Sequence, residues 1–173
     1  MKFHRRKTVS VIACLGVTAA FAQTPAAVTP PGDHKAAFTL SATGDLSYEC
    51  KAVADKPGTF AWTFAGPNAT LWDAGKKQVG RYYAGPTWES TDGSKVTGTQ
   101  LAISPGASGA IPLQLVQAST ATGDGVMAGV TYVQRLKTMG GVAPMTPACA
   151  AGNIGAKTTV PYSADYVFFK KAQ

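Results

Sequence analysis

Hydrophobic and polar residues alternate with a period of two along several short segments of the chain. In residues 46–52 (LSYECKA) the apolar side chains fall on one face, while Ser47, Glu49 and Lys51 fall on the other. Residues 60–64 (FAWTF) repeat the pattern with aromatic residues in register. Successive side chains of a strand point to opposite sides of a sheet, so this period predicts half-buried β-strands. Further strands are expected at residues 69–72, 78–83, 95–103, 111–116, 130–135 and 165–169.

Turn-forming residues separate these segments. Residues 73–75 (DAG), 92–93 (DG) and 123–125 (GDG) combine aspartate with glycine, which reaches positive φ without strain. No stretch of the sequence carries a sustained helical stripe of apolar residues. Short strands at this spacing predict an all-β fold, either a single-domain antiparallel sandwich or a barrel.

The first 22 residues have the organisation of a secretory signal peptide. Four Lys and Arg residues precede an apolar stretch at residues 8–21, and residues 20–22 (AFA) fit a cleavage site. A membrane anchor is disfavoured because about fourteen apolar residues fall short of the ~20 that a spanning helix needs. Lipid attachment at Cys14 is disfavoured because few apolar residues precede it. We therefore expect an exported protein, periplasmic or extracellular, with no transmembrane span.

The rest of the chain divides into two parts. Residues 23–36 predict a flexible Pro/Ala-rich leader, and residues 37–173 predict the β domain. Without the signal peptide, twelve Lys and Arg residues stand against nine Asp and Glu residues, which leaves a net charge of +3. No run of basic residues remains, so nucleic acid is not an expected partner. The pattern carries no indication of an oligomeric state.

Cysteine and histidine usage narrows the chemistry. Cys50 and Cys149 remain after cleavage, and an even pair in an exported protein predicts a disulfide, with two buried thiols as the alternative. Neither cysteine lies in a C-x-x-C motif, which disfavours catalytic redox chemistry. The chain also offers too few cysteine and histidine ligands for a metal site. His34 lies in the leader, which disfavours histidine-dependent catalysis. Residues 123–128 (GDGVMA) match a dinucleotide-binding pattern by letters, but no helix is expected after them, so no cofactor is predicted.

Aromatic and charged residues concentrate between residues 62 and 94. Their rings suit stacking on a glycan or a small aromatic ligand, and their charged groups suit directional hydrogen bonds. Core packing is the alternative for Trp88. If residues 87–90 are extended, Trp88 and Glu89 point to opposite faces, as do Tyr82 and Tyr83. The predicted ligand-binding set is Trp72, Arg81, Tyr83, Trp88 and Glu89.

Three functions remain open on the sequence, and no catalytic residue is assigned. A binding or surface-associated module is favoured by the aromatic density. A carboxylate-dependent hydrolase would need two of Asp73, Glu89 and Asp92 to converge, although Asp73 and Asp92 each lie beside a turn glycine. A structural or stress-related envelope protein without a small ligand would show a well-packed domain and no substantial pocket.

An ordered series of short motifs runs along the chain: residues 48–52 (YECKA), 62–64 (WTF), 69–73 (ATLWD), Gly80 followed by 82–89 (YYAGPTWE), 92–96 (DGSKV), 133–135 (VQR) and 161–164 (PYSA). The series covers most of residues 40–170 and resembles the domain of unknown function 3455 family. It implies an exported protein of bacteria or fungi and supplies no established activity, cofactor or catalytic residue. The family pattern has a histidine where this chain has Tyr82, so no role of that histidine is carried over.

Overall fold

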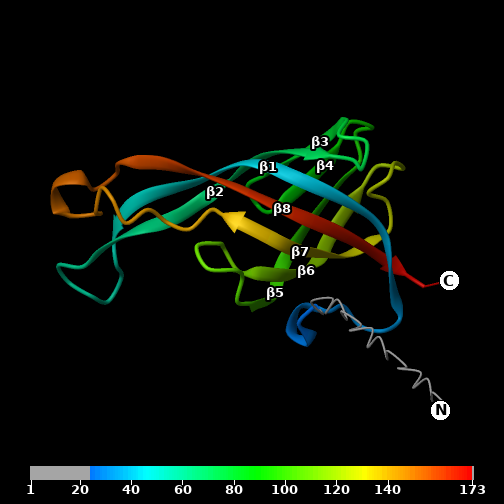
Figure 1. Ribbon diagram of the computed structural model, residues 1–173, viewed down its shortest axis with the longest axis horizontal. Helices are drawn as coiled ribbons and strands as arrows, with labels where there is room; N and C mark the ends of the chain where they lie inside the picture. Colours follow the sequence, from blue (N-terminus) through cyan, green and yellow to red (C-terminus); the bar gives the residue numbers. More distant parts are fainter. Residues whose placement is uncertain (1–23, 173) are drawn as a thin grey trace, which may run out of the picture.

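Eight antiparallel strands form one sheet that closes into a barrel (Figure 1). The structure is a computed structural model that describes residues 24–172, so the predicted signal peptide and Cys14 lie outside the described residues. The strands follow one another around the barrel in chain order, and β8 pairs with β1 to close it. Their bounds are β1 His34–Ala52, β2 Phe60–Trp72, β3 Gln78–Tyr83, β4 Thr87–Ser90, β5 Lys95–Ser104, β6 Leu113–Thr122, β7 Val130–Gly140 and β8 Lys157–Lys171.

The predicted fold class is confirmed, and the structure selects the barrel. Closure depends on the pairing of β1 with β8, whose register runs from His34 opposite Lys171 to Glu49 opposite Lys157. A closed sheet has no free edge strand, which removes a template for unwanted pairing. Among the described residues no helix is long and apolar enough to cross a membrane.

Alternation along each strand fills the barrel interior with apolar side chains. Trp88 has none of its surface exposed, and its ring stacks on Tyr82 at a centroid distance of 4.8 Å. Tyr166 and Phe168 of β8 pack against the same indole at 5.4 and 6.2 Å. The interior of an eight-stranded barrel is just wide enough for side chains to fill it. Small residues such as Ala42 therefore make room for these rings. The interior is therefore an aromatic core.

The β1–β2 hairpin projects beyond the barrel and is fastened to the loop before β8 (Figure 1). A disulfide joins Cys50 of β1 to Cys149 of that loop, with the Cα atoms 5.4 Å apart. The indole N–H of Trp62 donates to the carbonyl oxygen of Pro147 at 3.0 Å. The predicted disulfide is confirmed, and it holds together two segments that are 99 residues apart.

The hydroxyl of Tyr48 fastens the same two segments close to the barrel by donating to the carbonyl oxygen of Gly141. Gly141 has a φ of 78°, in the left-handed region, and a Cβ there would lie 2.8 Å from the Leu46 side chain. Only glycine fits this position without displacing the core.

Residues before β1 also contact the barrel. A 3₁₀ turn, η1 (Ala26–Val28), places Val28 in a fully buried position, and Gln134 of β7 donates to the carbonyl oxygen of Val28. The sequence placed the start of the folded domain at residue 37, whereas β1 begins at His34. The predicted leader thus includes residues with strand pairing and burial.

Candidate functional site

Four residues of the predicted ligand-binding set lie on one outer face of the barrel, formed by β2, β3 and β4. Arg81 and Tyr83 share a side of β3 because they are two residues apart, and Arg81 is the register partner of Glu89 on β4. Trp72 lies on the outside of β2, where its indole N–H donates to the hydroxyl of exposed Thr43 at 2.8 Å. Trp88 is the exception, because its side chain fills the interior.

Arg81, Tyr83 and Glu89 are joined through one carboxylate oxygen, and we call them the outer cluster. The Arg81 guanidinium donates to Oε2 of Glu89 from Nη2 at 3.0 Å and from Nε at 3.3 Å. The Tyr83 hydroxyl donates to the same oxygen at 2.6 Å. The guanidinium carbon of Arg81 also lies 5.0 Å from the centre of the Tyr83 ring, within the range of a cation–π contact. These contacts fix the orientation of all three side chains.

The outer cluster favours an ionised Glu89. The hydrogen bond from Tyr83, and then those from Arg81, lower the pKa of the Glu89 carboxyl. The same bond to Glu89 raises the pKa of the Tyr83 hydroxyl. A general acid needs a carboxyl whose pKa is raised toward the working pH, so Glu89 is poorly suited to donate a proton. It is suited to accept hydrogen bonds.

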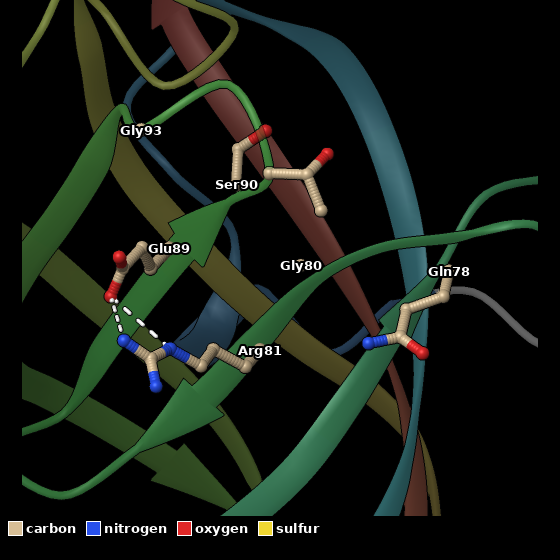
Figure 2. A pocket seen from close by; sticks show the side chains of 7 residues that line it. Gln78, Gly80, Arg81, Glu89, Ser90 and Gly93 are labelled. Carbon is tan, nitrogen blue, oxygen red and sulfur yellow. Dashed lines mark hydrogen bonds and ion pairs between the residues drawn. The ribbon is translucent and has the colours of Figure 1, made fainter.

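A hollow of about 260 Å³ lies beside the outer cluster. Figure 2 shows Arg81 and Glu89 facing each other across β3 and β4, with Gln78 at the opposite edge. All three hydrogen bonds to Glu89 reach Oε2, and Oε1 has no partner within residues 24–172. Arg81 is 67% exposed, which leaves guanidinium N–H groups open to solvent. Residues from Gln78 to Gly93 line the hollow: Gln78, Gly80, Arg81, Glu89, Ser90, Thr91 and Gly93.

The other two candidate carboxylates form turns at one end of the barrel. Oδ1 of Asp73 accepts the backbone N–H of Lys77 at 2.9 Å in the β2–β3 turn. Oδ1 of Asp92 accepts the backbone N–H of Ser94 at 2.8 Å and its hydroxyl at 2.6 Å. Oδ2 of Asp92 accepts the backbone N–H of Val126 at 2.8 Å, which ties the β4–β5 turn to the β6–β7 loop. Both aspartates line one hollow of about 370 Å³, but these bonds give Oδ1 of Asp73 and both oxygens of Asp92 structural roles, so they do not support a hydrolase built on the pair.

Asp92 makes stability depend on pH in a defined window. The Ser94 hydroxyl, and then backbone N–H groups, lower the pKa of Asp92 from 3.8 to about 2. Because the folded state holds the lower pKa, the stabilisation is complete above pH 3.8 and is lost as the pH falls toward about 2. We expect the Asp92→Asn variant to unfold at a lower temperature than the wild type at neutral pH. The difference should shrink between pH 3.8 and about 2, as followed by thermal melts. A difference in melting temperature between the two proteins that stays constant across that window would contradict the stabilising role of the ionised Asp92 carboxylate.

One charged residue that faces the interior was not in the predicted set. Arg135 of β7 shares the inward side with fully buried Val133 and lines two hollows at the end of the barrel. The sequence did not mark it as inward-facing, because Arg135 shares its side of the predicted strand with Thr131 and Val133, while Val130 and Tyr132 lie on the other side. Arg135 also lies outside residues 62–94, where the aromatic and charged residues concentrate.

Comparisons with known proteins place the chain in a family. Within residues 24–172 no group of three or more His, Cys, Asp or Glu residues is arranged to hold a metal ion. No curated protein and no solved structure matches the chain. The resemblance that the motif series indicated is confirmed by a family match that covers residues 30–170. The chain belongs to the family described as protein of unknown function (DUF3455).

Proposed function

We propose that the protein is an exported binding module whose ligand face is the outer cluster and the hollow beside it. The proposal rests on one observation: three side chains from two strands are held in a fixed arrangement on the surface, around a carboxylate whose second oxygen has no partner in the described part of the chain. Ordered polar groups at a concave surface are what a small-ligand site requires. A face that served only solubility would not need such order.

The chemistry of the face favours a ligand rich in hydroxyl groups, such as a glycan. Oε1 of Glu89 can accept a hydrogen bond while the exposed N–H groups of Arg81 donate, so two neighbouring hydroxyls can be bound together. Gln78 adds an amide at the opposite edge of the hollow. A flat aromatic ligand is less well served, because Arg81 already covers one face of the Tyr83 ring.

Export is the second part of the proposal. Its basis is the signal-peptide pattern of residues 1–22, and the disulfide between Cys50 and Cys149 is compatible with it. Disulfides persist in oxidising compartments and are rare in the cytosol of mesophiles. A hydroxyl-rich ligand would then be met in the periplasm or outside the cell.

Glu89→Gln tests the binding proposal. The substitution removes the negative charge that holds Arg81 and replaces the ionised hydrogen-bond acceptor with a neutral amide. We expect soluble hexasaccharides of glucose or N-acetylglucosamine to bind the variant roughly 10- to 150-fold more weakly, which is the usual loss for one charge-assisted hydrogen bond. Isothermal titration calorimetry measures the difference. Glu49→Gln is the matched control, because Glu49 pairs with Lys51 on the projecting hairpin, away from the outer cluster. Failure of both saccharides to bind, or equal affinity for Glu89→Gln and the wild type, would contradict the proposal.

A further inference from the structure

One end of the barrel is open and contains two adjoining hollows of about 180 and 260 Å³. This end carries the β3–β4 turn and the base of the projecting β1–β2 hairpin. We call the shared region the barrel mouth. Barrel mouths are common places for small-ligand sites because the surrounding sheet is rigid. The residues that line both hollows are Phe64, Tyr82, Gln100, Gln114 and Arg135.

Arg135 brings a positive charge into this mouth, and it has no carboxylate partner among residues 24–172. Its Nε and Nη2 both donate to the carbonyl oxygen of Pro112, at 3.2 and 3.0 Å. None of the ion pairs described among residues 24–172 includes Arg135, so no carboxylate there lies within 4.0 Å of its guanidinium. A half-buried cation whose only bonded partner is a neutral carbonyl retains most of its attraction for an anion.

The phenols around Arg135 do not neutralise it. Burial raises the pKa of Tyr48, and it raises the pKa of Tyr82 well above the ordinary value. The charge of Arg135 acts in the opposite direction on both hydroxyls, but burial is the larger effect. Both phenols therefore stay protonated at neutral pH, and the guanidinium charge remains available.

Other groups in the mouth suit the remainder of an organic anion. The side-chain amide of Gln114 donates to the amide oxygen of Gln100, which orients both glutamines beside Arg135. Phe64 is 54% exposed at the rim, where its ring meets Tyr48 edge-on at a centroid distance of 5.9 Å. An exposed aromatic ring next to a cation site can cover an apolar group of a bound ligand. The smaller hollow is also lined by apolar Leu46 and Ile111.

We propose that the barrel mouth binds a small organic carboxylate that carries an aromatic or other compact apolar group. The carboxylate pairs with the Arg135 guanidinium, the glutamine amides supply hydrogen bonds, and the apolar group packs on Phe64. A carboxylate fits better than inorganic phosphate, because the site offers one guanidinium and an apolar wall. Each hollow is smaller than the pockets that drug-sized ligands usually occupy. The ligand is therefore about the size of a single ring with its carboxylate.

This site is separate from the outer cluster. The hollow beside Glu89 and the two hollows of the mouth share no lining residue. The proposal therefore does not depend on the glycan site, and each can fail alone. Benzoate binding should be unaffected by Glu89→Gln, and hexasaccharide binding should be unaffected by changes at Arg135.

The probe is benzoate, with neutral benzyl alcohol as its uncharged counterpart. We expect benzoate to shift the backbone amide resonances of Phe64, Gln114 and Arg135 in a saturable manner in ¹H–¹⁵N spectra of the wild type, and benzyl alcohol to bind at least ~10-fold more weakly. Arg135→Gln should weaken benzoate binding by a similar factor, while Arg135→Lys should retain part of it. Lys137→Gln is the matched control, because it removes an equal charge from β7 at an exposed lysine paired with Asp165.

Three results would overturn the proposal. The first is the absence of saturable shifts at the mouth of the wild type with benzoate, which needs no variant to be folded. The second is equal affinity for benzoate and benzyl alcohol. The third is equal weakening by Arg135→Gln and Lys137→Gln, which would indicate only a general loss of positive charge.

Discussion

Replacement of Trp88 by alanine should lower the free energy of unfolding by about 3–5 kcal/mol, the usual cost of removing a large buried aromatic side chain. The indole is completely buried, and three aromatic rings from β3 and β8 pack against it. The cavity left by Trp88→Ala would therefore be walled by rings from opposite parts of the closed barrel, which cannot collapse without moving strands. Urea denaturation followed by far-ultraviolet circular dichroism measures the loss.

Trp72→Ala is the matched control for Trp88→Ala. Trp72 lies on the outer face of the adjoining strands, only partly buried, and its indole bonds to exposed Thr43. We expect a much smaller loss of stability there, because less apolar surface is removed from the packed interior. If Trp88→Ala and Trp72→Ala proved equally mild, Trp88 would not be the centre of the core, and its role would have to be sought in ligand contact.

Removal of the disulfide should have the second large effect. The bond joins cysteines 99 residues apart, and removal of a native disulfide typically costs about 2–5 kcal/mol in small disulfide-bonded domains. We expect the Cys50→Ser/Cys149→Ser double variant to melt roughly 5–15 °C below the oxidised wild type. Differential scanning calorimetry checks the shift.

The reduced wild type provides the control for the double variant. Both lack the covalent link, so the two should melt at nearly the same temperature, whereas reducing agent should leave the double variant unchanged. The bond from the Trp62 indole to Pro147 remains in both, so the loop before β8 keeps one of its contacts with the hairpin. A double variant as stable as the oxidised wild type would contradict a stabilising role for this link.

Alternation predicted β3 well, because that strand has one buried and one exposed side, but it found only residues 46–52 of β1 and 165–169 of β8. The predicted segment 78–83 coincides with β3, because Gly80 and Tyr82 face inward while Arg81 is exposed. It failed at β2, which the sequence divided into residues 60–64 and 69–72. Gly66 and Pro67 interrupt the apolar pattern there, yet both pair with β1, and a register shift between Ser47 and Tyr48 follows directly.

Two further features depend on contacts between distant residues. The four residues of β4 are largely buried on both sides, so no alternation separates them from a loop. The choice between sandwich and barrel depends on whether the first and last strands pair, and Leu40 lies opposite Tyr166 only in the folded chain. Local sequence carries no information about such a pairing.

The candidate site was predicted in part. The strand period predicts that Trp88 and Glu89 point to opposite sides of the sheet. In the structure Trp88 is buried in the interior and Glu89 pairs with Arg81 on the outer face. The sequence did not anticipate that Arg81, Tyr83 and Glu89 lie together, because that depends on the register of β3 against β4. Because Arg81 lies opposite Glu89 in this register, Oε2 of Glu89 accepts hydrogen bonds from both Arg81 and Tyr83.

The most direct test of the ligand face is a titration of the ¹⁵N-labelled protein with a hexasaccharide, read at individual side chains. Trp72 pairs in register with Gln78 at the edge of the hollow, whereas Trp88 is sealed in the interior. We predict that the Arg81 Nε–H and Trp72 indole resonances shift in a saturable manner, while the Trp88 indole resonance stays in place. Unchanged Arg81 and Trp72 resonances at saturating hexasaccharide, or shifts confined to the barrel mouth, would contradict a ligand face at the outer cluster.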